Sequence, residues 1–400
     1  MIIESSFSDF LNIQDWDSHS RLLGEICRKD VETALQREGK GGIEDLRALL
    51  SPLAGENYLE EMAKLSRVLT RKRFGMGIRL FAPVYLSNEC NNVCDYCGFS
   101  MHNQIPRKTL TDAEILREAG ILKQKGFDHL LLVTGESSQR VGLDYLCHAL
   151  DLLRPHFANL SIEVQPLSLA DYSCLIKHGM HAVMVYQETY EKKSYTRHHL
   201  KGKKTLFDWR LNTADRLGRA GVNKIGLGCL FGLTGDWRTD AFYSGMHLQY
   251  LEKKYWQTSY SMSFPRIRPY EGKNIVAADV KDRDLVQLLC AFRIFNHELE
   301  ITLSTRENPQ LRENLLPLGV TTMSAGSKTN PGGYANEDLS LEQFSTSDER
   351  TSEEISTMLR SRGYEPIWKD WDSAYDLPNR AGLCEANRST SLELSHSVGQ

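Results

Sequence analysis

The sequence lacks a long apolar run and carries little net charge. No stretch approaches the roughly 20 apolar residues that span a bilayer, and residues 1–14 lack the basic and apolar segments of a secretory signal. A formal net charge of -4 over 400 residues argues against a nucleic-acid-binding surface. We therefore expect a cytoplasmic protein whose partners include neither nucleic acid nor a membrane.

The sequence also lacks grouped cysteines outside a single loop. Nine cysteines are present, and disulfides are not expected among them in an intracellular chain. Six stand alone, which is typical of small buried side chains; they are Cys27, Cys147, Cys174, Cys229, Cys290 and Cys384.

The other three cysteines lie in one short run, Cys90-Asn91-Asn92-Val93-Cys94-Asp95-Tyr96-Cys97. Three thiolates on one loop can hold three irons of a four-iron cluster and leave the fourth iron open to a small molecule. The alternative is a structural zinc site with His102 as fourth ligand. Zinc sites more often pair two knuckles, and no second knuckle exists here, so we favour iron–sulfur.

Short apolar runs alternate with helical patterns through the middle of the chain. The expected strands are 80–86, 130–134, 160–164, 182–186, 224–228, 259–263, 299–303 and 319–324. The expected helices between them are 112–124, 143–153, 169–177, 206–220, 239–255, 282–295 and 310–316. This order predicts an α/β fold, an eight-stranded (β/α)8 barrel of the TIM type. A six-stranded open barrel or a doubly wound sheet is the alternative, because the last two strands are weaker.

The remaining segments flank this barrel. Residues 1–75 are expected to form an N-terminal layer, with three helices between residues 18 and 73, and residues 76–330 to form the barrel. Residues 331–386, with a helix near 353–360, are expected to pack on it. The serine-rich tail 387–400 has little to bury and is expected to be disordered.

Polar residues follow several of the expected strands, where barrels of this type place reactive groups. Strand by strand they are Gly135 and Glu136, then Glu163, then Gln187 and Glu188, and finally Arg306 and Ser324. The sequence thus predicts that these side chains collect at one mouth of the barrel, together with the cysteine loop.

The cysteine spacing, with the aromatic Tyr96 before the third cysteine, resembles that of radical S-adenosylmethionine enzymes. The turn Val133-Thr134-Gly135-Glu136 matches their second motif, with threonine at its usual first glycine. The resemblance implies a four-iron, four-sulfur cluster held by Cys90, Cys94 and Cys97. It also implies that S-adenosylmethionine chelates the open iron and is split into methionine and a hydrogen-abstracting adenosyl radical. The residues then expected to bind S-adenosylmethionine are Tyr96, Gly135, Glu136, Glu163, Gln187, Glu188 and Arg197.

Longer segments resemble one branch of that superfamily, the 2-iminoacetate synthases, which are the tyrosine lyases of bacterial thiamine biosynthesis. The matching segments include Val185–Tyr190, His198–Lys204 and Lys328–Tyr334, within a resemblance from about Asp15 to Asp372. It implies cleavage of the Cα–Cβ bond of L-tyrosine to 2-iminoacetate and p-cresol, with 5′-deoxyadenosine and methionine as co-products. It also implies thiazole synthase and a flavodoxin- or ferredoxin-type electron donor as partners. Arg306 with Ser324 is the expected clamp for the substrate carboxylate.

Several alternatives remain open at this point. Hydrogenase maturation enzymes also cleave tyrosine but need several late cysteines, and only Cys384 follows Cys290. Tryptophan lyases and deazaflavin-forming synthases fit the later segments less well, and biotin-synthase-like sulfur donors need a second cluster inside the barrel. A non-catalytic zinc scaffold is the alternative from another class. The basic run between Lys192 and Lys204 is a solvated loop, a lid or a docking patch for an acidic electron donor.

Overall fold

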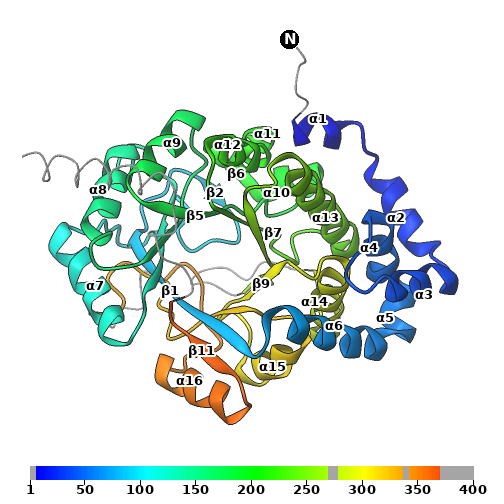
Figure 1. The fold of residues 1–400 in the computed structure, drawn as a ribbon. Coiled ribbons are helices and arrows are strands. Elements are labelled where there is room, and N and C mark those ends of the chain that lie inside the picture. Colours follow the sequence, from blue (N-terminus) through cyan, green and yellow to red (C-terminus); the bar gives the residue numbers. More distant parts are fainter. Residues whose placement is uncertain (1–5, 269–277, 337–341, 370–400) are drawn as a thin grey trace, which may run out of the picture.

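The computed structural model describes residues 6–268, 278–336 and 342–369. Nine strands form one parallel sheet in the order β10-β9-β8-β7-β5-β4-β3-β1-β11. Strand β10 pairs back onto β1, with Thr322 opposite Arg79, so the strands from β1 to β10 close into a barrel (Figure 1). This closure confirms the predicted (β/α)8 barrel and excludes an open sheet. The barrel strands are β1 (Gly77–Ser87), β3 (His129–Thr134), β4 (Asn159–Glu163), β5 (Met180–Met184), β7 (Lys224–Gly228), β8 (Ser259–Ser263), β9 (Glu300–Leu303) and β10 (Thr322–Ser324).

Helices surround this barrel, and most lie where the apolar periodicity predicts them. They are α7 (Asp112–Gln124), α8 (Leu143–Leu153), α9 (Leu169–Lys177), α10 (Lys192–His198), α13 (Trp237–Lys254), α14 (Asp282–Phe295), α15 (Pro309–Leu315) and the short 3-10 helix η2 (Leu316–Leu318). The helix predicted over 206–220 is divided into α11 (Phe207–Leu211) and α12 (Thr213–Ala220). The break lies at Asn212, whose side-chain amide hydrogen-bonds both the backbone and the hydroxyl of Ser8. A tertiary contact therefore interrupts a segment whose periodicity favours one helix.

The alternation of side chains along β1 divides the barrel interior from its helical jacket. Phe81, Pro83 and Tyr85 point inward and line a cavity. Their neighbours Leu80, Ala82, Val84 and Leu86 belong to the large hydrophobic core. One strand thus contributes both to the packing that stabilises the fold and to the wall of the candidate site.

Charged side chains occupy the amino-terminal end of the barrel interior. Arg79 on β1 donates to Glu300 on β9 over 2.7 Å, and Lys224 on β7 pairs with the same carboxylate. Burial alone would raise the pKa of Glu300, but these two cations outweigh it and lower the pKa to about 2. The carboxylate is therefore ionised and pairs with both cations, away from the carboxyl ends of the strands.

The N-terminal segment forms more helices than the three predicted. These are α1 (Phe7–Asn12), α2 (Trp16–Gly24), α3 (Arg28–Gln36), α4 (Ile43–Leu50), α5 (Pro52–Asn57) and α6 (Leu59–Phe74). The extra breaks have local causes: Asp15 caps α2, and Ser51 caps α5 with Pro52 in its first turn. Helices α4 and α6 pack on α14, and α2 and α4 on α13, so this layer covers one side of the barrel (Figure 1).

The segment after the barrel contributes α16 (Ser352–Ser361) and the unpredicted strand β11 (Glu365–Ile367). Strand β11 extends the sheet beside the start of β1, with Glu365 opposite Gly77. The tail expected to be disordered, 387–400, lies outside the described residues. Among the helices that the structure describes, none combines the length and apolarity required to cross a membrane.

Candidate active site

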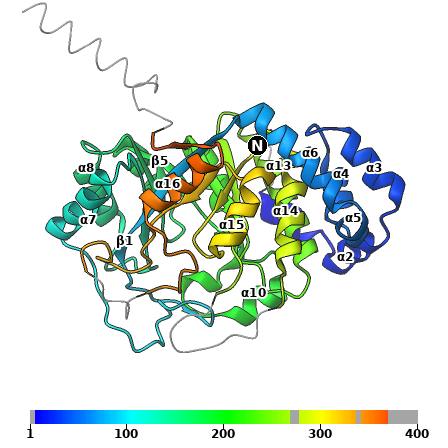
Figure 2. The same cartoon turned by 90° about the horizontal axis from the view of Figure 1, so that it is seen from below.

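A cavity of about 180 Å³ opens at the carboxyl ends of the barrel strands. Figure 2 shows the long loop after β1 and helix α10 at the same end of the barrel. Most of the predicted site residues line this cavity; they are Cys90, Cys94, Cys97, Tyr96, Gly135, Glu136, Glu163, Glu188, Arg306 and Ser324. The expectation that polar strand ends meet at one mouth therefore agrees with the geometry.

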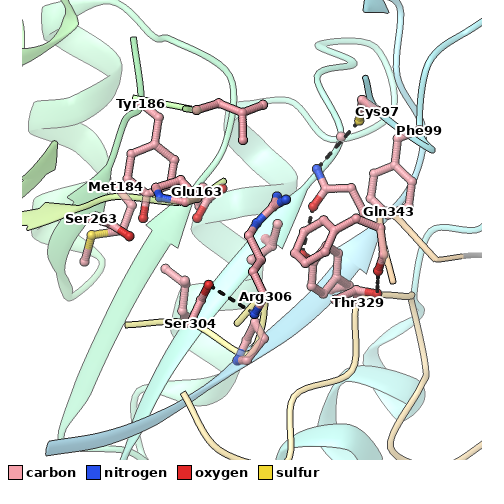
Figure 3. A pocket seen from close by; sticks show the side chains of 18 of the residues that line it. Cys97, Phe99, Glu163, Met184, Tyr186, Ser263, Ser304, Arg306, Thr329 and Gln343 are labelled. Carbon is pink, nitrogen blue, oxygen red and sulfur yellow. Dashed lines mark hydrogen bonds between the residues drawn. The ribbon is translucent and has the colours of Figure 1, made fainter. Parts of the chain in front are cut away.

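The cysteine loop is held from two sides. Its two-residue strand β2 (Val93–Cys94) pairs antiparallel with β6 (His199–Lys201), which places His199 opposite Cys94. On the other side Gln343 accepts the backbone N–H of Gly98 over 2.9 Å. The Gln343 amide nitrogen also lies 3.8 Å from the Cys97 sulfur (Figure 3). A side chain on Gly98 would place its Cβ 2.5 Å from the Glu342 carbonyl oxygen, so this approach requires glycine.

The three sulfurs of the loop are not gathered closely enough for all of them to bind one zinc ion. Tetrahedral zinc with Zn–S bonds of about 2.3 Å would bring its thiolates within about 3.8 Å of one another. Among the described residues, the sulfur atoms of the three loop cysteines do not all lie within 4.8 Å of one another, although all three cysteines line the same cavity. A cluster needs a wider separation, because each thiolate binds a different iron. The cavity lining also offers no fourth cysteine or histidine.

The thiols of this loop are protonated in the absence of metal. Burial, and after it the nearby Glu136 charge, raises the pKa of Cys90 to about 11. Burial raises the pKa values of Cys94 and Cys97 as well, while the Lys204 ammonium acts in the opposite direction on both. Iron ligation must therefore displace protons, and Lys204 provides positive charge beside the thiolates.

Two carboxylates and two cations form a closed ion network next to the cysteines. Arg210 donates to Glu136 over 2.8 Å and to Glu188 over 3.3 Å, and Lys204 donates to Glu188 over 2.7 Å. Asn92, within the cysteine loop, donates to the other oxygen of Glu136 over 2.8 Å and accepts the Lys204 backbone N–H over 3.0 Å. The network is electrically balanced and fixes the loop to the ends of β3 and β5.

Glu188 has an unusual backbone conformation within that network. Its φ of 73° lies in the left-handed region, which costs a non-glycine residue of order 1 kcal/mol. Its carbonyl accepts the Leu230 N–H over 2.8 Å, which holds the turn. Burial alone would raise the pKa of Glu188, but Lys204 and Arg210 outweigh it and the pKa is lowered. The carboxylate is thus ionised and rigidly aimed.

The turn after β3 lies against the cysteine loop. The Gly135 N–H donates to the Ser87 carbonyl over 2.9 Å, and the Asn91 N–H donates to the Glu136 carbonyl over 3.0 Å. A Cβ on Gly135 would lie 2.3 Å from the Glu89 carbonyl oxygen, so the glycine has a steric cause. The hydroxyl of Thr134, which lines the cavity, is buried without a hydrogen-bond partner among the described residues. That orphaned group fits a site that a polar cofactor completes.

Tyr96 covers the same end of the cavity. Its hydroxyl lies 2.7 Å from the Nε2 atom of His199, and the Lys204 ammonium lies 5.5 Å from its ring centre. Burial, and then the Lys204 charge, lowers the pKa of His199 to about 2. The imidazole is therefore neutral and acts as a fixed hydrogen-bond partner for the phenol.

Arg306 lies at the opposite side of the cavity, at the end of β9. Figure 3 shows its side chain rising between Glu163 and Gln343. Its guanidinium stacks 3.5 Å from the ring centre of Phe344. Glu307, the neighbouring carboxylate, pairs with Arg266 and Arg268 instead. Within the described ranges Arg306 has no ion pair at all, which marks it as a cation available to a ligand.

Glu163 and Ser324 complete that side. Burial, and after it the Glu188 charge, raises the pKa of Glu163 to about 7. The Ser324 hydroxyl oxygen accepts the Thr305 N–H over 3.1 Å, and so holds the loop that carries Arg306. Ser324 therefore positions the arginine, and its hydroxyl hydrogen stays available to a ligand.

Two of the expected cofactor residues do not line the cavity. Gln187 is buried beside it, because residues alternate along the extended strand end and Glu188 takes the inward place. Arg197 is exposed on α10, since His198 and Tyr195 occupy the buried side of that helix. Neither side chain faces the space in which S-adenosylmethionine would bind.

Four other cavity residues were not singled out from the sequence: Lys204, Arg210, Gln343 and Phe344. Lys204 lay in a basic run that favours a solvated loop, and Arg210 in a predicted helix. Gln343 and Phe344 belong to a segment without helix or strand periodicity. Of these four, only Lys204 could have been recognised from the sequence, because it lies in the segment His198–Lys204 that resembles the family.

Comparison with known proteins gives matches over nearly the whole chain. The model of the Radical SAM superfamily matches residues 84–242, and that of the Biotin and Thiamin Synthesis associated domain matches residues 263–365. The 2-iminoacetate synthase of Escherichia coli (strain K12) is 49% identical over 368 residues, covering 92% of this chain and 97% of that protein. The 2-iminoacetate synthase of Salmonella typhimurium (strain LT2) is 48% identical with the same coverage. The X-ray structure of the FeFe-hydrogenase maturase HydG from Carboxydothermus hydrogenoformans superimposes with a TM-score of 0.83 at 29% identity, covering 92% of this chain and 86% of that one.

Proposed function

Since this chain belongs to the 2-iminoacetate synthases of the radical SAM superfamily, we propose that its cavity cleaves the Cα–Cβ bond of L-tyrosine. The products are 2-iminoacetate and p-cresol, with 5′-deoxyadenosine and methionine as co-products. When bound, the four-iron cluster and S-adenosylmethionine supply one-electron reduction and abstraction of a hydrogen atom from the substrate. The 2-iminoacetate then supplies the thiazole moiety in thiamine biosynthesis.

One observation supports this assignment above the others: three thiols and a guanidinium without an ion pair among the described residues line the same cavity. Arg306 is partly buried, and removing a cation from water is costly unless an anion compensates it. A substrate carboxylate on Arg306 would supply that anion through a bidentate contact. The stacking on Phe344 keeps the guanidinium plane in place for it.

We assign the chain's own residues to three tasks. Cys90, Cys94 and Cys97 hold the cluster. The residues of the ion network beside the cysteine loop contact S-adenosylmethionine, and Glu163 faces the same space from β4. Arg306 and Ser324 hold the substrate carboxylate. The network residues are Tyr96, Gly135, Glu136 and Glu188, with Lys204 and Arg210 fixing the two carboxylates.

The test is anaerobic incubation of the reconstituted enzyme with S-adenosylmethionine, dithionite and one amino acid at a time. We expect p-cresol and 5′-deoxyadenosine from tyrosine, together with glyoxylate, the hydrolysis product of 2-iminoacetate. Activity with tryptophan alone, or with no aromatic amino acid, would reject the proposal. Colour separates the remaining alternative, because an iron–sulfur protein is brown and a zinc scaffold is colourless.

We also propose that the exposed part of the segment from α10 to the 3-10 helix η1 (Lys203–Thr205) receives the electron donor, a flavodoxin- or ferredoxin-type protein. The segment carries the exposed cations Lys193, Arg197, Lys201 and Lys203, and Leu200 is 60% exposed. Its strand β6 pairs directly with β2, which contains Cys94. An acidic donor bound here would lie one strand away from the cluster, and its complementary charge would accelerate the encounter.

Salt dependence tests this docking surface. With flavodoxin as reductant, the rate should fall as ionic strength rises, and a Lys201→Glu, Lys203→Glu double variant should slow it by about 10-fold or more. With dithionite, which needs no docking, the same variant should retain wild-type activity. Equal rates for variant and wild type with flavodoxin would place the donor elsewhere.

Two further expectations belong to this proposal. Thiazole synthase is the proposed acceptor of the product, because an imine hydrolyses in water and direct transfer avoids that loss. The proposed compartment is the reducing cytoplasm, where three free thiols can acquire iron. Retention of thiazole synthase on the immobilised, cluster-loaded enzyme would support the first, and no retention would count against it.

A further inference from the structure

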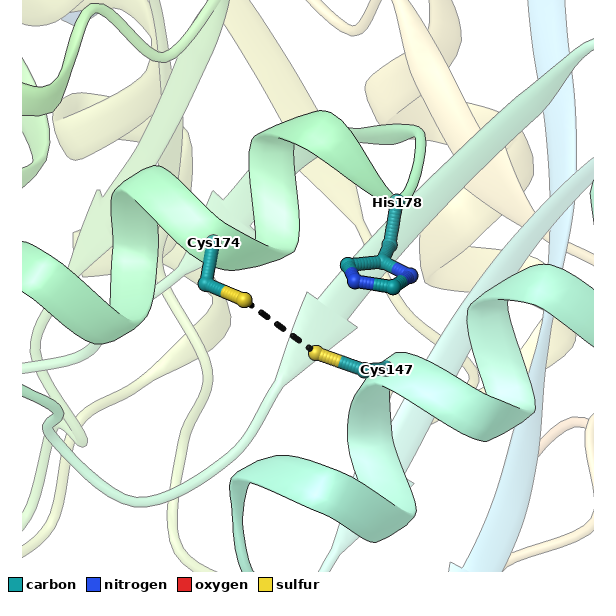
Figure 4. A group of neighbouring side chains, drawn as sticks. All are labelled: Cys147, Cys174 and His178. Atoms are coloured by element: carbon teal, nitrogen blue, oxygen red, sulfur yellow. Dashed lines mark hydrogen bonds between the residues drawn. The ribbon is translucent and has the colours of Figure 1, made fainter.

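A second group of metal-ligating side chains lies outside the active site, between helices α8 and α9. Cys147, Cys174 and His178 each offer one ligand atom, and these three atoms all lie within 4.8 Å of one another. Figure 4 shows the two sulfurs pointing toward each other from neighbouring helices, with the imidazole beside them. Within the described residues no other trio of cysteine, histidine and carboxylate side chains meets this criterion.

The arrangement follows from helical spacing on two adjacent helices. Cys147 and Asp151 are four residues apart on α8, and Cys174 and His178 are four residues apart on and just after α9, so each pair shares one face. The helices bring the sulfurs to 3.8 Å and the Asp151 carboxylate to 2.8 Å from the Nδ1 atom of His178. A carboxylate on one ring nitrogen is the usual support for a metal-binding imidazole.

The sulfur–sulfur distance excludes a disulfide and allows both sulfurs to bind one metal ion. A disulfide needs about 2.05 Å between its sulfurs, whereas two thiolates on tetrahedral zinc with bonds of about 2.3 Å lie about 3.8 Å apart. The observed 3.8 Å matches the second arrangement. We propose that Cys147, Cys174 and His178 bind Zn²⁺, with water in the fourth position and Asp151 supporting the imidazole through its Nδ1 atom.

The surroundings favour a cation and allow it to enter. Cys147 is buried, whereas Cys174 and His178 are partly exposed, so the site opens to solvent on one side. The Asp151 and Asp144 carboxylates place negative charge beside Cys147, which favours a cation there. Binding balances when Zn²⁺ displaces two thiol protons to solvent, which leaves two thiolates and a neutral imidazole around the ion.

A bound zinc ion would fasten together two helices behind the catalytic strands. Helix α8 connects β3 to β4, and α9 connects β4 to β5. These strands lead to Glu136, Glu163 and Glu188, which line the cavity. The ion would therefore stabilise the part of the barrel that carries these carboxylates, without contact with substrate.

The test uses the cluster-loaded enzyme, so that Cys90, Cys94 and Cys97 are occupied by iron. We expect about one zinc ion per chain after exposure to Zn²⁺ and gel filtration, with zinc-edge X-ray absorption showing two sulfur neighbours. Cys147→Ser and His178→Ala should each weaken zinc binding by more than about 100-fold. Asp151→Asn should weaken it by about 10- to 100-fold, because it removes only the support of the imidazole.

The matched control is Cys27→Ser, an exposed single cysteine that precedes helix α3, which should bind zinc like the wild type. Iron and sulfide content should stay constant in all four variants. Wild-type protein should also unfold at a higher temperature with zinc, and His178→Ala should lose that gain. His178 is partly exposed, so a folded variant is available even if Cys147→Ser is unstable.

Zinc retained by the His178 and Cys147 variants, zinc coordinated without sulfur, or a wild type that binds no zinc would each overturn the proposal. A Cys147–Cys174 disulfide in protein isolated anaerobically would overturn it as well.

Discussion

The two sides of the active-site cavity differ in how their charges are balanced. On the cysteine side, Glu136 and Glu188 are matched by Arg210 and Lys204 at 2.7–3.3 Å. On the β9 side, Arg306 stacks on the ring of Phe344, makes a weak 3.5 Å contact to the Arg266 carbonyl and has no ion pair among the described residues. The charges on the cysteine side are balanced before any ligand enters, whereas the charge of Arg306 is balanced only by a ligand.

This difference separates the tasks of positioning and selection. A balanced, hydrogen-bonded network is rigid and can hold a cofactor in one orientation. A partly buried cation without an ion pair instead discriminates between molecules, because a ligand without a carboxylate leaves its charge unpaired. We therefore expect changes on the cysteine side to affect every turnover, and changes at Arg306 to affect tyrosine selectively.

The largest effect should come from the cluster ligands. Cys94→Ala removes one of three thiolates, so we expect loss of both p-cresol and 5′-deoxyadenosine, together with most of the bound iron. Product analysis and iron determination on anaerobic protein measure this, with Cys27→Ser as the matched control. Normal turnover by Cys94→Ala would contradict the cluster assignment, and the cysteine side of the cavity would then have no cofactor to position.

The next largest effect should come from the balanced network. Lys204→Met leaves Glu188 with a single cation, and breaking a buried ion pair typically costs about 3–5 kcal/mol. We expect a lower unfolding temperature and little 5′-deoxyadenosine with or without tyrosine. The adjacent Lys203→Met is the control, because Lys203 is exposed and dithionite can serve as reductant. If the two variants behaved alike, the ion network would not be what holds the cofactor in position.

A more selective effect is expected at the unpaired cation. Arg306→Ala removes a charge-assisted contact worth roughly 1.5–3 kcal/mol, so kcat/KM for tyrosine should fall by about 10- to 100-fold. Formation of 5′-deoxyadenosine without tyrosine should persist, and Arg306→Lys should recover part of the loss. Steady-state kinetics with both products measured give the answer. Unchanged saturation by tyrosine would exclude Arg306 from the clamp.

The smallest effect concerns Glu163 and the pH dependence of stability. Its folded pKa of about 7 exceeds the ordinary 4.5, so the folded protein binds this proton more tightly than the unfolded chain does. Its contribution to stability is fully present below about pH 4.5 and is lost as the pH rises through about 7. Glu163→Gln should therefore raise the unfolding temperature of cofactor-free protein by about 1–3 °C at pH 8. At pH 4.5 it should raise that temperature little or not at all, and equal shifts at both pH values would contradict the buried, protonated carboxyl.

The repeating strands and helices were predictable because their period depends on local side-chain order. Helices 112–124, 143–153 and 169–177 were predicted with the bounds that the structure shows. The break at Asn212 was not predictable, because its cause is a contact with Ser8, which is distant in sequence. The same limit applies to β11, a three-residue strand that forms by pairing with the start of β1.

The sequence by itself determined the chemistry of this protein: the spacing of three cysteines, the glycine beside them and the arginine after a strand are local patterns. Only the tertiary structure decided which charges are paired. Glu136, Glu188, Lys204 and Arg210 come from three separate stretches of the chain, and their balance depends on distances of a few ångströms. Arg306 is available to a ligand because the neighbouring Glu307 forms its ion pairs with Arg266 and Arg268 instead. Coulomb energies change steeply over such distances in a buried site. These distances cannot be deduced from the spacing of the residues along the chain.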